Sequence, residues 1–129
     1  MSEPRWIAKQ AVFLLHAESL AEHGGAEGIR DEGALESALV KPINQYTYAG
    51  TSDMSVLAAA YAAGLSRNHP FLDGNIPAAF ITMGLFLALN GLRLVATRVD
   101  TARVMLALAA GQLSEAELAE WVHSHVEPR

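Results

Sequence analysis

Apolar residues gather in long stretches of this chain, separated by short segments rich in glycine, asparagine, aspartate and proline. Two stretches, residues 54–67 and 76–89, are apolar around nearly the whole helical circumference, so each predicts a helix buried in the middle of the fold. Other apolar stretches predict covering helices and a short extended segment: helices at about 4–23, 31–40, 100–110 and 115–126, and the extended segment at 92–96. The pattern predicts an all-α fold, a compact bundle of about six helices in which two central helices flank a loop.

Punctuating residues indicate where the first two helices begin and end. Pro4 suits the first turn of a helix, and Gly24-Gly25 is a typical C-terminal stop. Asp31 can cap the second helix, and Pro42 is expected to close it. Residues 43–52 have no helical period, so we expect a connecting loop whose tyrosines cover the core. A loop that packs beside the site or docks a partner is the alternative.

Later capping signals are clearer. Ser52 or Asp53 can cap the third helix, and Ser114 with Glu117 forms a capping box for the last one. Gly64 lies inside the third helix, where glycine costs helical stability, so it indicates a close approach to another helix.

Composition narrows the class of protein. The 129 residues form one expected domain, 1–129, long enough to bury a core. The absence of cysteine excludes disulfides and thiolate chemistry and fits a reducing cytoplasm. No apolar run reaches the roughly 18 residues of a membrane span, so we expect no membrane partner. A net charge of −5 with only nine scattered Lys and Arg argues against direct nucleic-acid binding.

The chemistry is concentrated in the segment between the two central helices, N-H-P-F-L-D-G-N. His69 is a general-base type, and a carboxylate four residues later, Asp73, can hold magnesium through its oxygens. Backbone amides around Gly74 and Asn75, just before a helix, can hold an anion. Together these parts suit the transfer of a phosphate-containing group to a hydroxyl. The plainer interpretation is an exposed turn whose Pro, Asp, Gly and Asn serve turn geometry.

The stretch His69–Asn75, followed by Ala78-Ala79-Phe80, resembles the signature of the Fic and Doc (death on curing) family, which runs His-Pro-Phe-x-Asp/Glu-Gly-Asn. Other segments resemble the Doc branch in order and spacing: Leu15–Ala17, Gly24-Gly25, Gly28–Asp31, Leu35–Leu39 and Ser66–Asn68. The resemblance spans essentially the whole chain and implies an all-α bundle.

The resemblance also implies roles for the central residues. His69 would be the general base on a protein hydroxyl, and Asp73 would be the carboxylate that holds magnesium. Asn75 and the amides around Gly74 would hold phosphate oxygens, and Phe71 would anchor the loop in the core. The implied cofactors are ATP and Mg²⁺.

Asn68 and His16 are further candidates near the site, although His16 inside the first helix is more simply a partly buried histidine bonded to a neighbour. By resemblance, Doc toxins phosphorylate translation elongation factor Tu, whereas most other Fic proteins transfer AMP. The resemblance also implies an antitoxin partner with a disordered tail that folds on the toxin.

The chain departs from the family after Asn75, where the family has Lys or Gly and then Arg. Ile76 and Pro77 occupy these phosphate-binding positions, so the expected cations are missing and Pro77 removes one N–H. We therefore expect weakened catalysis. Arg67 is a candidate to compensate, although a solvated arginine at a helix end is the simpler interpretation.

Two other functions remain open. A catalytically inactive Fic/Doc-fold module could bind a partner peptide in the same groove. A metal-dependent hydrolase using His16, His69 and Asp73 has the least support, because no paired His-x-x-x-His spacing accompanies these residues.

Overall fold

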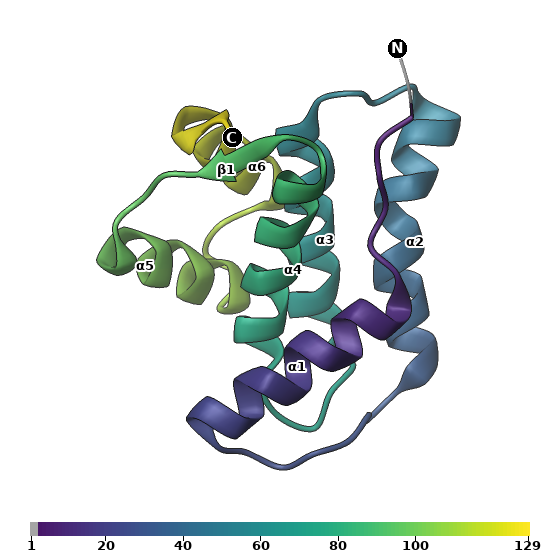
Figure 1. The fold of residues 1–129 in the computed structure, drawn as a ribbon, viewed down its shortest axis with the longest axis vertical. Coiled ribbons are helices and arrows are strands. Elements are labelled where there is room, and N and C mark those ends of the chain that lie inside the picture. Colours follow the sequence, from purple (N-terminus) through teal and green to yellow (C-terminus); the bar gives the residue numbers. More distant parts are fainter. Residues whose placement is uncertain (1–2) are drawn as a thin grey trace.

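The computed structural model describes residues 3–129, and within them the chain forms six helices and one two-stranded sheet (Figure 1). In chain order the elements are α1 (Lys9–His23), α2 (Glu32–Ala49), α3 (Met54–Asn68), α4 (Asn75–Leu89), β1 (Leu92–Leu94), α5 (Arg98–Ala109), α6 (Glu115–His125) and β2 (Val126–Pro128). The all-α bundle predicted from the sequence is confirmed, with a small sheet added.

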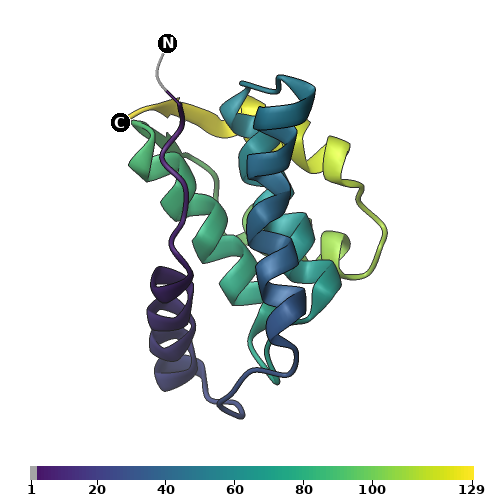
Figure 2. The same ribbon diagram turned by 90° about the vertical axis from the view of Figure 1, so that its right-hand side faces the viewer.

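The two helices predicted to be central, α3 and α4, lie side by side in the middle of the molecule (Figures 1 and 2). The helix α3 packs against α2, α4 and α6, and its residues from Leu57 to Ser66 are all buried. Gly64 permits the close packing of α2: a Cβ atom there would lie 3.2 Å from the Cα of Ala38. The close approach inferred from Gly64 is confirmed.

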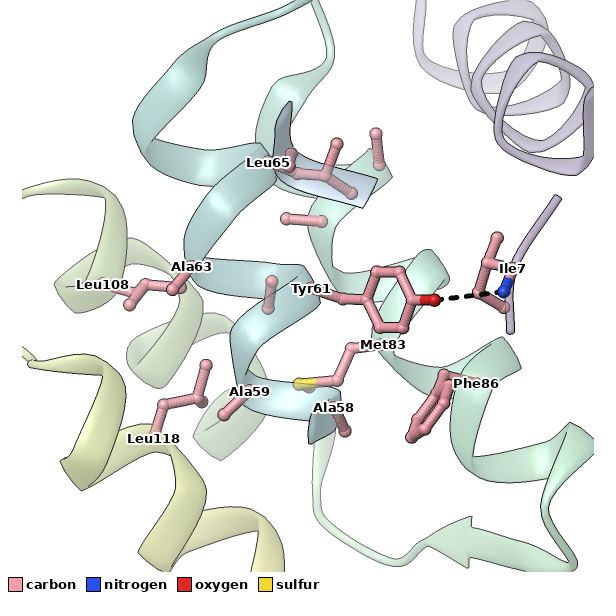
Figure 3. Close-up of a cluster of buried hydrophobic side chains, with 14 of the residues drawn as sticks. Ile7, Ala58, Ala59, Tyr61, Ala63, Leu65, Met83, Phe86, Leu108 and Leu118 are labelled. Atoms are coloured by element: carbon pink, nitrogen blue, oxygen red, sulfur yellow. Dashed lines mark hydrogen bonds between the residues drawn. The ribbon is translucent and has the colours of Figure 1, made fainter. Parts of the chain in front are cut away.

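Tyr61 of α3 stands at the centre of the core (Figure 3). Its side chain is fully buried, and its ring centroid lies 5.2 Å from that of Phe86 in α4. The phenol oxygen accepts a hydrogen bond of 3.1 Å from the backbone N–H of Ile7. One buried side chain thereby joins the two central helices to the N-terminal segment.

The N-terminal helix begins later than Pro4, the start expected from the sequence. Residues 3–8 have no regular secondary structure, and α1 begins at Lys9. Arg5 explains the difference, because its N–H donates to Asn90 Oδ1 at 2.8 Å and its carbonyl accepts from Asn90 Nδ2 at 3.1 Å. A helix from Pro4 would leave the Arg5 and Ile7 N–H groups without an intrahelical acceptor. In the observed segment both N–H groups and the Arg5 carbonyl have side-chain partners.

The second helix continues through Pro42 to Ala49, so the expected loop at 43–52 is wrong over most of its length. Proline inside a helix removes one hydrogen bond and crowds the preceding turn, and packing must offset that cost. Pro42 is buried, and Tyr46 one turn later meets Trp6 with ring centroids 5.7 Å apart. Tyr48 is 83% exposed, so only one of the two tyrosines covers the core.

The C-terminal end differs in two respects from the expectation. The helix α5 begins at Arg98, before the expected start at about residue 100, and Thr97 caps it through a 3.1 Å bond from the Asp100 N–H. After α6 the chain turns into β2, which pairs antiparallel with β1 from Leu92↔Pro128 to Leu94↔Val126. The capping box predicted at Ser114 is present. Over residues 3–129, no helix combines the length and apolarity needed to cross a bilayer.

Candidate active site

The active-site loop is predicted over residues 68–75; in the structure residues 69–74 join α3 to α4 beside α1, because Asn68 ends α3 and Asn75 begins α4 (Figure 1). Gly74, the N-cap of α4, has φ 77°, a left-handed conformation that favours glycine. A Cβ atom there would lie 3.3 Å from Leu20 and 3.5 Å from the His16 ring. The glycine therefore lets the loop turn into α4 while lying against α1.

His69 is exposed at the C-terminal end of α3, and within residues 3–129 its ring forms no hydrogen bond. Its backbone is left-handed, with φ 45° and ψ 56°. The backbone of the following residue is tied down, because the N–H groups of Arg30 and Asp31 both donate to the Pro70 carbonyl, at 2.7 and 3.1 Å. Within residues 3–129 the imidazole is thus unpaired, and the main chain that carries it is held by hydrogen bonds.

Phe71 is almost completely buried, as expected of a loop anchor, and stacks on His16 with ring centroids 3.7 Å apart. Asn75 bonds the backbone of the same residue: its Oδ1 accepts from the Phe71 N–H and its Nδ2 donates to the Phe71 carbonyl, both at 3.0 Å. The Asn75 amide is therefore engaged with the loop itself. Its expected role toward phosphate stays a prediction.

Asp73 is held on both its main chain and its side chain. The His16 Nε2–H donates to the Asp73 carbonyl at 2.8 Å, so His16 is buried directly beneath the loop. The carboxylate Oδ2 accepts the Ala26 N–H at 2.8 Å. Gly25 permits this contact, because a Cβ atom there would lie 3.1 Å from the Asp73 Cβ. Oδ1 forms no hydrogen bond within the described residues and is the free oxygen of the pair.

A complete protein-only metal site is absent from the described part of the chain, since no three His, Cys, Asp or Glu side chains gather there. The hydrolase alternative with His16, His69 and Asp73 as ligands therefore has no structural basis. A single free carboxylate oxygen on Asp73 fits Mg²⁺ of the kind that takes most of its ligands from substrate phosphates and water.

The start of α4 provides the candidate anion site. The N–H groups of Asn75 and Ile76 belong to the first turn and have no acceptor within the helix, whereas Pro77 contributes none. Ile76 and Pro77 line a cavity of about 480 Å³ between α1, α4 and α5, together with Phe80 and Arg98. The cavity wall is mainly apolar on the side where the family has its cation.

Arg67 does not supply the missing cation in this structure. Its guanidinium lies 3.8 Å from the Glu115 carboxylate of α6. Asn68 has a structural contact as well, because its Nδ2 donates to the Ala34 carbonyl at 2.9 Å and ties the end of α3 to α2.

Sequence reasoning singled out the loop residues and His16, and it named Gly24-Gly25 and Gly28–Asp31 only as segments that resemble the Doc branch. It did not predict that residues 25–31 fasten the loop. Leu72 N–H donates to the Gly28 carbonyl at 3.2 Å, and Ile29 pairs with Phe71 as an isolated antiparallel bridge. The Arg30 side chain donates to the carbonyls of Asn68, the last residue of α3, and His69, the first residue of the loop. The available signal was a glycine-rich turn carrying one arginine, but nothing in the sequence indicates which residues it touches.

The sequence was also compared with known protein families and proteins. The sequence model of the Fic/DOC family matches residues 6–87. The chain is 27% identical to the protein kinase doc of Escherichia phage P1 over 116 residues, which covers 90% of this chain and 91% of that protein. It is 38% identical to the toxin Doc of Mycolicibacterium smegmatis over 86 residues, which covers 64% of each chain.

Proposed function

Because this chain belongs to the Fic/DOC family, we propose that it is a Doc-type toxin of a toxin–antitoxin pair. In this proposal it transfers a phosphoryl group from ATP to a hydroxyl of a translation factor, for which elongation factor Tu is the candidate by resemblance. The observation that carries the proposal is the arrangement of the loop. Within seven residues it presents the unpaired imidazole of His69, the carboxylate of Asp73 with one oxygen not hydrogen-bonded, and the N-terminus of α4.

Each group has a definite part in this reaction. His69 accepts the proton from the attacking hydroxyl. Asp73 Oδ1 would hold magnesium, which supplies positive charge next to the phosphates when it is bound. The N–H groups of Asn75 and Ile76, at the positive end of α4, would bind phosphate oxygens. The buried Phe71 keeps the loop in place while these groups act.

We infer that the reaction is slow in this chain. Phosphoryl transfer depends almost entirely on positioning and on electrostatic stabilisation, and the loss of a phosphate-binding cation typically lowers the rate by orders of magnitude. Arg98 lines the same cavity as Ile76 and Pro77 and offers one guanidinium nearby. A single arginine on another helix replaces the family's cation only in part, because it is not fixed on the helix that holds the phosphates.

The second candidate is a catalytically inactive module that binds a partner peptide. The apolar wall formed by Ile76, Pro77 and Phe80 favours it, since such a wall suits apolar side chains better than phosphate. Under either proposal, an antitoxin whose disordered tail folds on binding is the expected partner.

Label transfer separates these functions. The purified chain is incubated with magnesium, bacterial extract and ATP labelled on either the α or the γ phosphate, beside the Ile76→Lys/Pro77→Arg variant. Transfer of γ label to a band of elongation-factor size supports the kinase, and transfer of α label indicates AMP transfer. His69→Ala in the double variant is the matched control and should abolish any transfer.

The double variant also distinguishes a disarmed toxin from a binding module. If only Ile76→Lys/Pro77→Arg transfers label, and its expression arrests growth unless antitoxin is present, the chain is a toxin weakened at these two positions. If neither chain transfers label, the kinase proposal is wrong and the peptide-binding module takes its place.

A further inference from the structure

The backbone of His69 is held in a conformation that its local sequence disfavours. Within residues 3–129 it is the one non-glycine residue with positive φ. A left-handed conformation is costly for a residue with a Cβ atom. The next residue, Pro70, further biases His69 toward extended conformations. Contacts from elsewhere in the fold must therefore hold this residue in place.

Arg30 provides those contacts at the position where they act on His69. Its Nε donates to the His69 carbonyl at 2.6 Å, and its Nη2 donates to the Asn68 carbonyl at 2.7 Å. The Arg30 backbone N–H donates to the Pro70 carbonyl at 2.7 Å. One residue therefore bonds three consecutive carbonyls around the left-handed turn.

The chemistry of arginine suits this position. The last carbonyls of a helix have no intrahelical donor, and the planar guanidinium can donate to two of them at once. Its positive charge also lies at the negative end of the α3 dipole. Within the described residues Arg30 forms no ion pair with a carboxylate. Its side chain is instead engaged by the hydrogen bonds to the Asn68 and His69 carbonyls.

We propose that Arg30 is the positioning residue of His69: it fixes the left-handed turn that sets the direction in which the imidazole leaves α3. The catalytic part of this inference rests on the proposed function, in which His69 is the base. The conformational part stands without it. Arg30 itself acts through the main chain and does not touch the reacting atoms.

The conformational part is tested by NMR on the protein as it is. We expect Arg30→Ala to shift the His69 Cα and amide resonances and to change its H–N–Cα–H coupling, because φ is released. Amide exchange at Leu72, which bonds the Gly28 carbonyl, should accelerate by at least about tenfold. Arg93→Ala is the matched control, since that exposed arginine pairs with the Glu127 side chain on the small sheet; it should leave both signals unchanged.

Arg30→Lys covers the case in which Arg30→Ala fails to fold. A single ammonium can donate to one carbonyl but cannot reproduce the two-point geometry. We therefore expect its His69 coupling and Leu72 exchange to fall between those of the wild type and the alanine variant. Wild-type coupling and exchange in either variant would overturn the positioning role, as would equal changes in the Arg93 control.

The catalytic part is tested in the Ile76→Lys/Pro77→Arg background. We expect Arg30→Ala to lower kcat by at least about tenfold while the KM for ATP stays within about twofold, with partial recovery in Arg30→Lys. If Arg30 had a purely structural role, Arg30→Ala would lower the amount of folded protein, and the kcat of the folded fraction would not fall relative to its KM for ATP. If the background itself transfers no label, the proposed function fails, whereas the NMR result still decides whether Arg30 positions His69.

Discussion

Asn75 is the residue at which a structural role and a phosphate-binding role predict different stabilities for the protein without nucleotide. If its side chain holds the loop, replacing it lowers the free energy of unfolding; if it only binds phosphate, replacing it leaves that free energy unchanged. In the structure its side chain forms hydrogen bonds of 3.0 Å with both the N–H and the carbonyl of the buried Phe71. Replacement by alanine removes two hydrogen bonds, each worth about 0.5–1.5 kcal/mol, and leaves a buried N–H and a buried carbonyl without partners. We expect Asn75→Ala to lower the free energy of unfolding by about 2 kcal/mol.

The direction of this effect is not due to helix propensity, since alanine is the better helix former in the first turn of α4. Asn75→Asp keeps the acceptor for the Phe71 N–H but puts a carboxylate oxygen, which cannot donate, beside the Phe71 carbonyl. This repulsion opposes the favourable charge at a helix N-terminus, so its loss should also be about 2 kcal/mol. Asn44→Ala, an exposed position on α2, is the control and should change stability by less than about 0.5 kcal/mol.

The assay is urea unfolding without nucleotide, followed by circular dichroism and fitted with a common slope for all variants. A midpoint for Asn75→Ala equal to that of Asn44→Ala would refute the reasoning. If that variant also bound ATP more weakly, Asn75 would be a phosphate ligand that does not clamp the loop. A large loss of stability with unaltered ATP binding would assign it to the loop alone.

Two further predictions concern the core. Burial raises the pKa of the Tyr61 phenol, although the Ile7 N–H opposes the shift, so the folded state keeps this proton more tightly than the unfolded chain. Tyr61→Phe should lower the free energy of unfolding by about 1–2 kcal/mol at neutral pH, measured by urea unfolding against the exposed control Tyr48→Phe. The difference in stability from wild type should shrink as pH rises above 10.0, and a difference that stays constant would contradict the direction of the pKa shift. Gly64→Val places side-chain atoms against Ala38, because a Cβ atom at this position would lie 3.2 Å from that residue. Thermal unfolding should therefore show a loss of stability of about 2 kcal/mol or more. A gain in stability, which helix propensity alone would predict, would show that α2 moves away without cost.

The sequence by itself determined the elements whose signals are local. The helices α3 and α4 were predictable because their apolar residues extend around the whole helix, which only a central position can satisfy. Asp53 and Ser114 were predictable as caps, because a short polar side chain bonds an N–H only two or three residues away. The residue types of the central loop likewise indicated the candidate groups, His69 and Asp73, whose roles stay a prediction.

Tertiary structure decided the features that depend on partners far along the chain. The segment 3–8 is not helical, and Asn90, at the end of α4, bonds both backbone groups of Arg5. The helix α2 passes through Pro42 because burial there offsets a local penalty that the sequence shows clearly. In both cases a contact between distant residues outweighs a local preference of about 1–3 kcal/mol.

The candidate site divides in the same manner. The loop sequence named His69 and Asp73, but it contained no information on what holds them in place. Arg30 reaches the His69 carbonyl across 39 positions of the chain, and His16 reaches the Asp73 carbonyl across 57. Local sequence fixes which groups are present, whereas their directions depend on hydrogen bonds that form only when α1 and the segment after it have packed against the ends of α3 and α4.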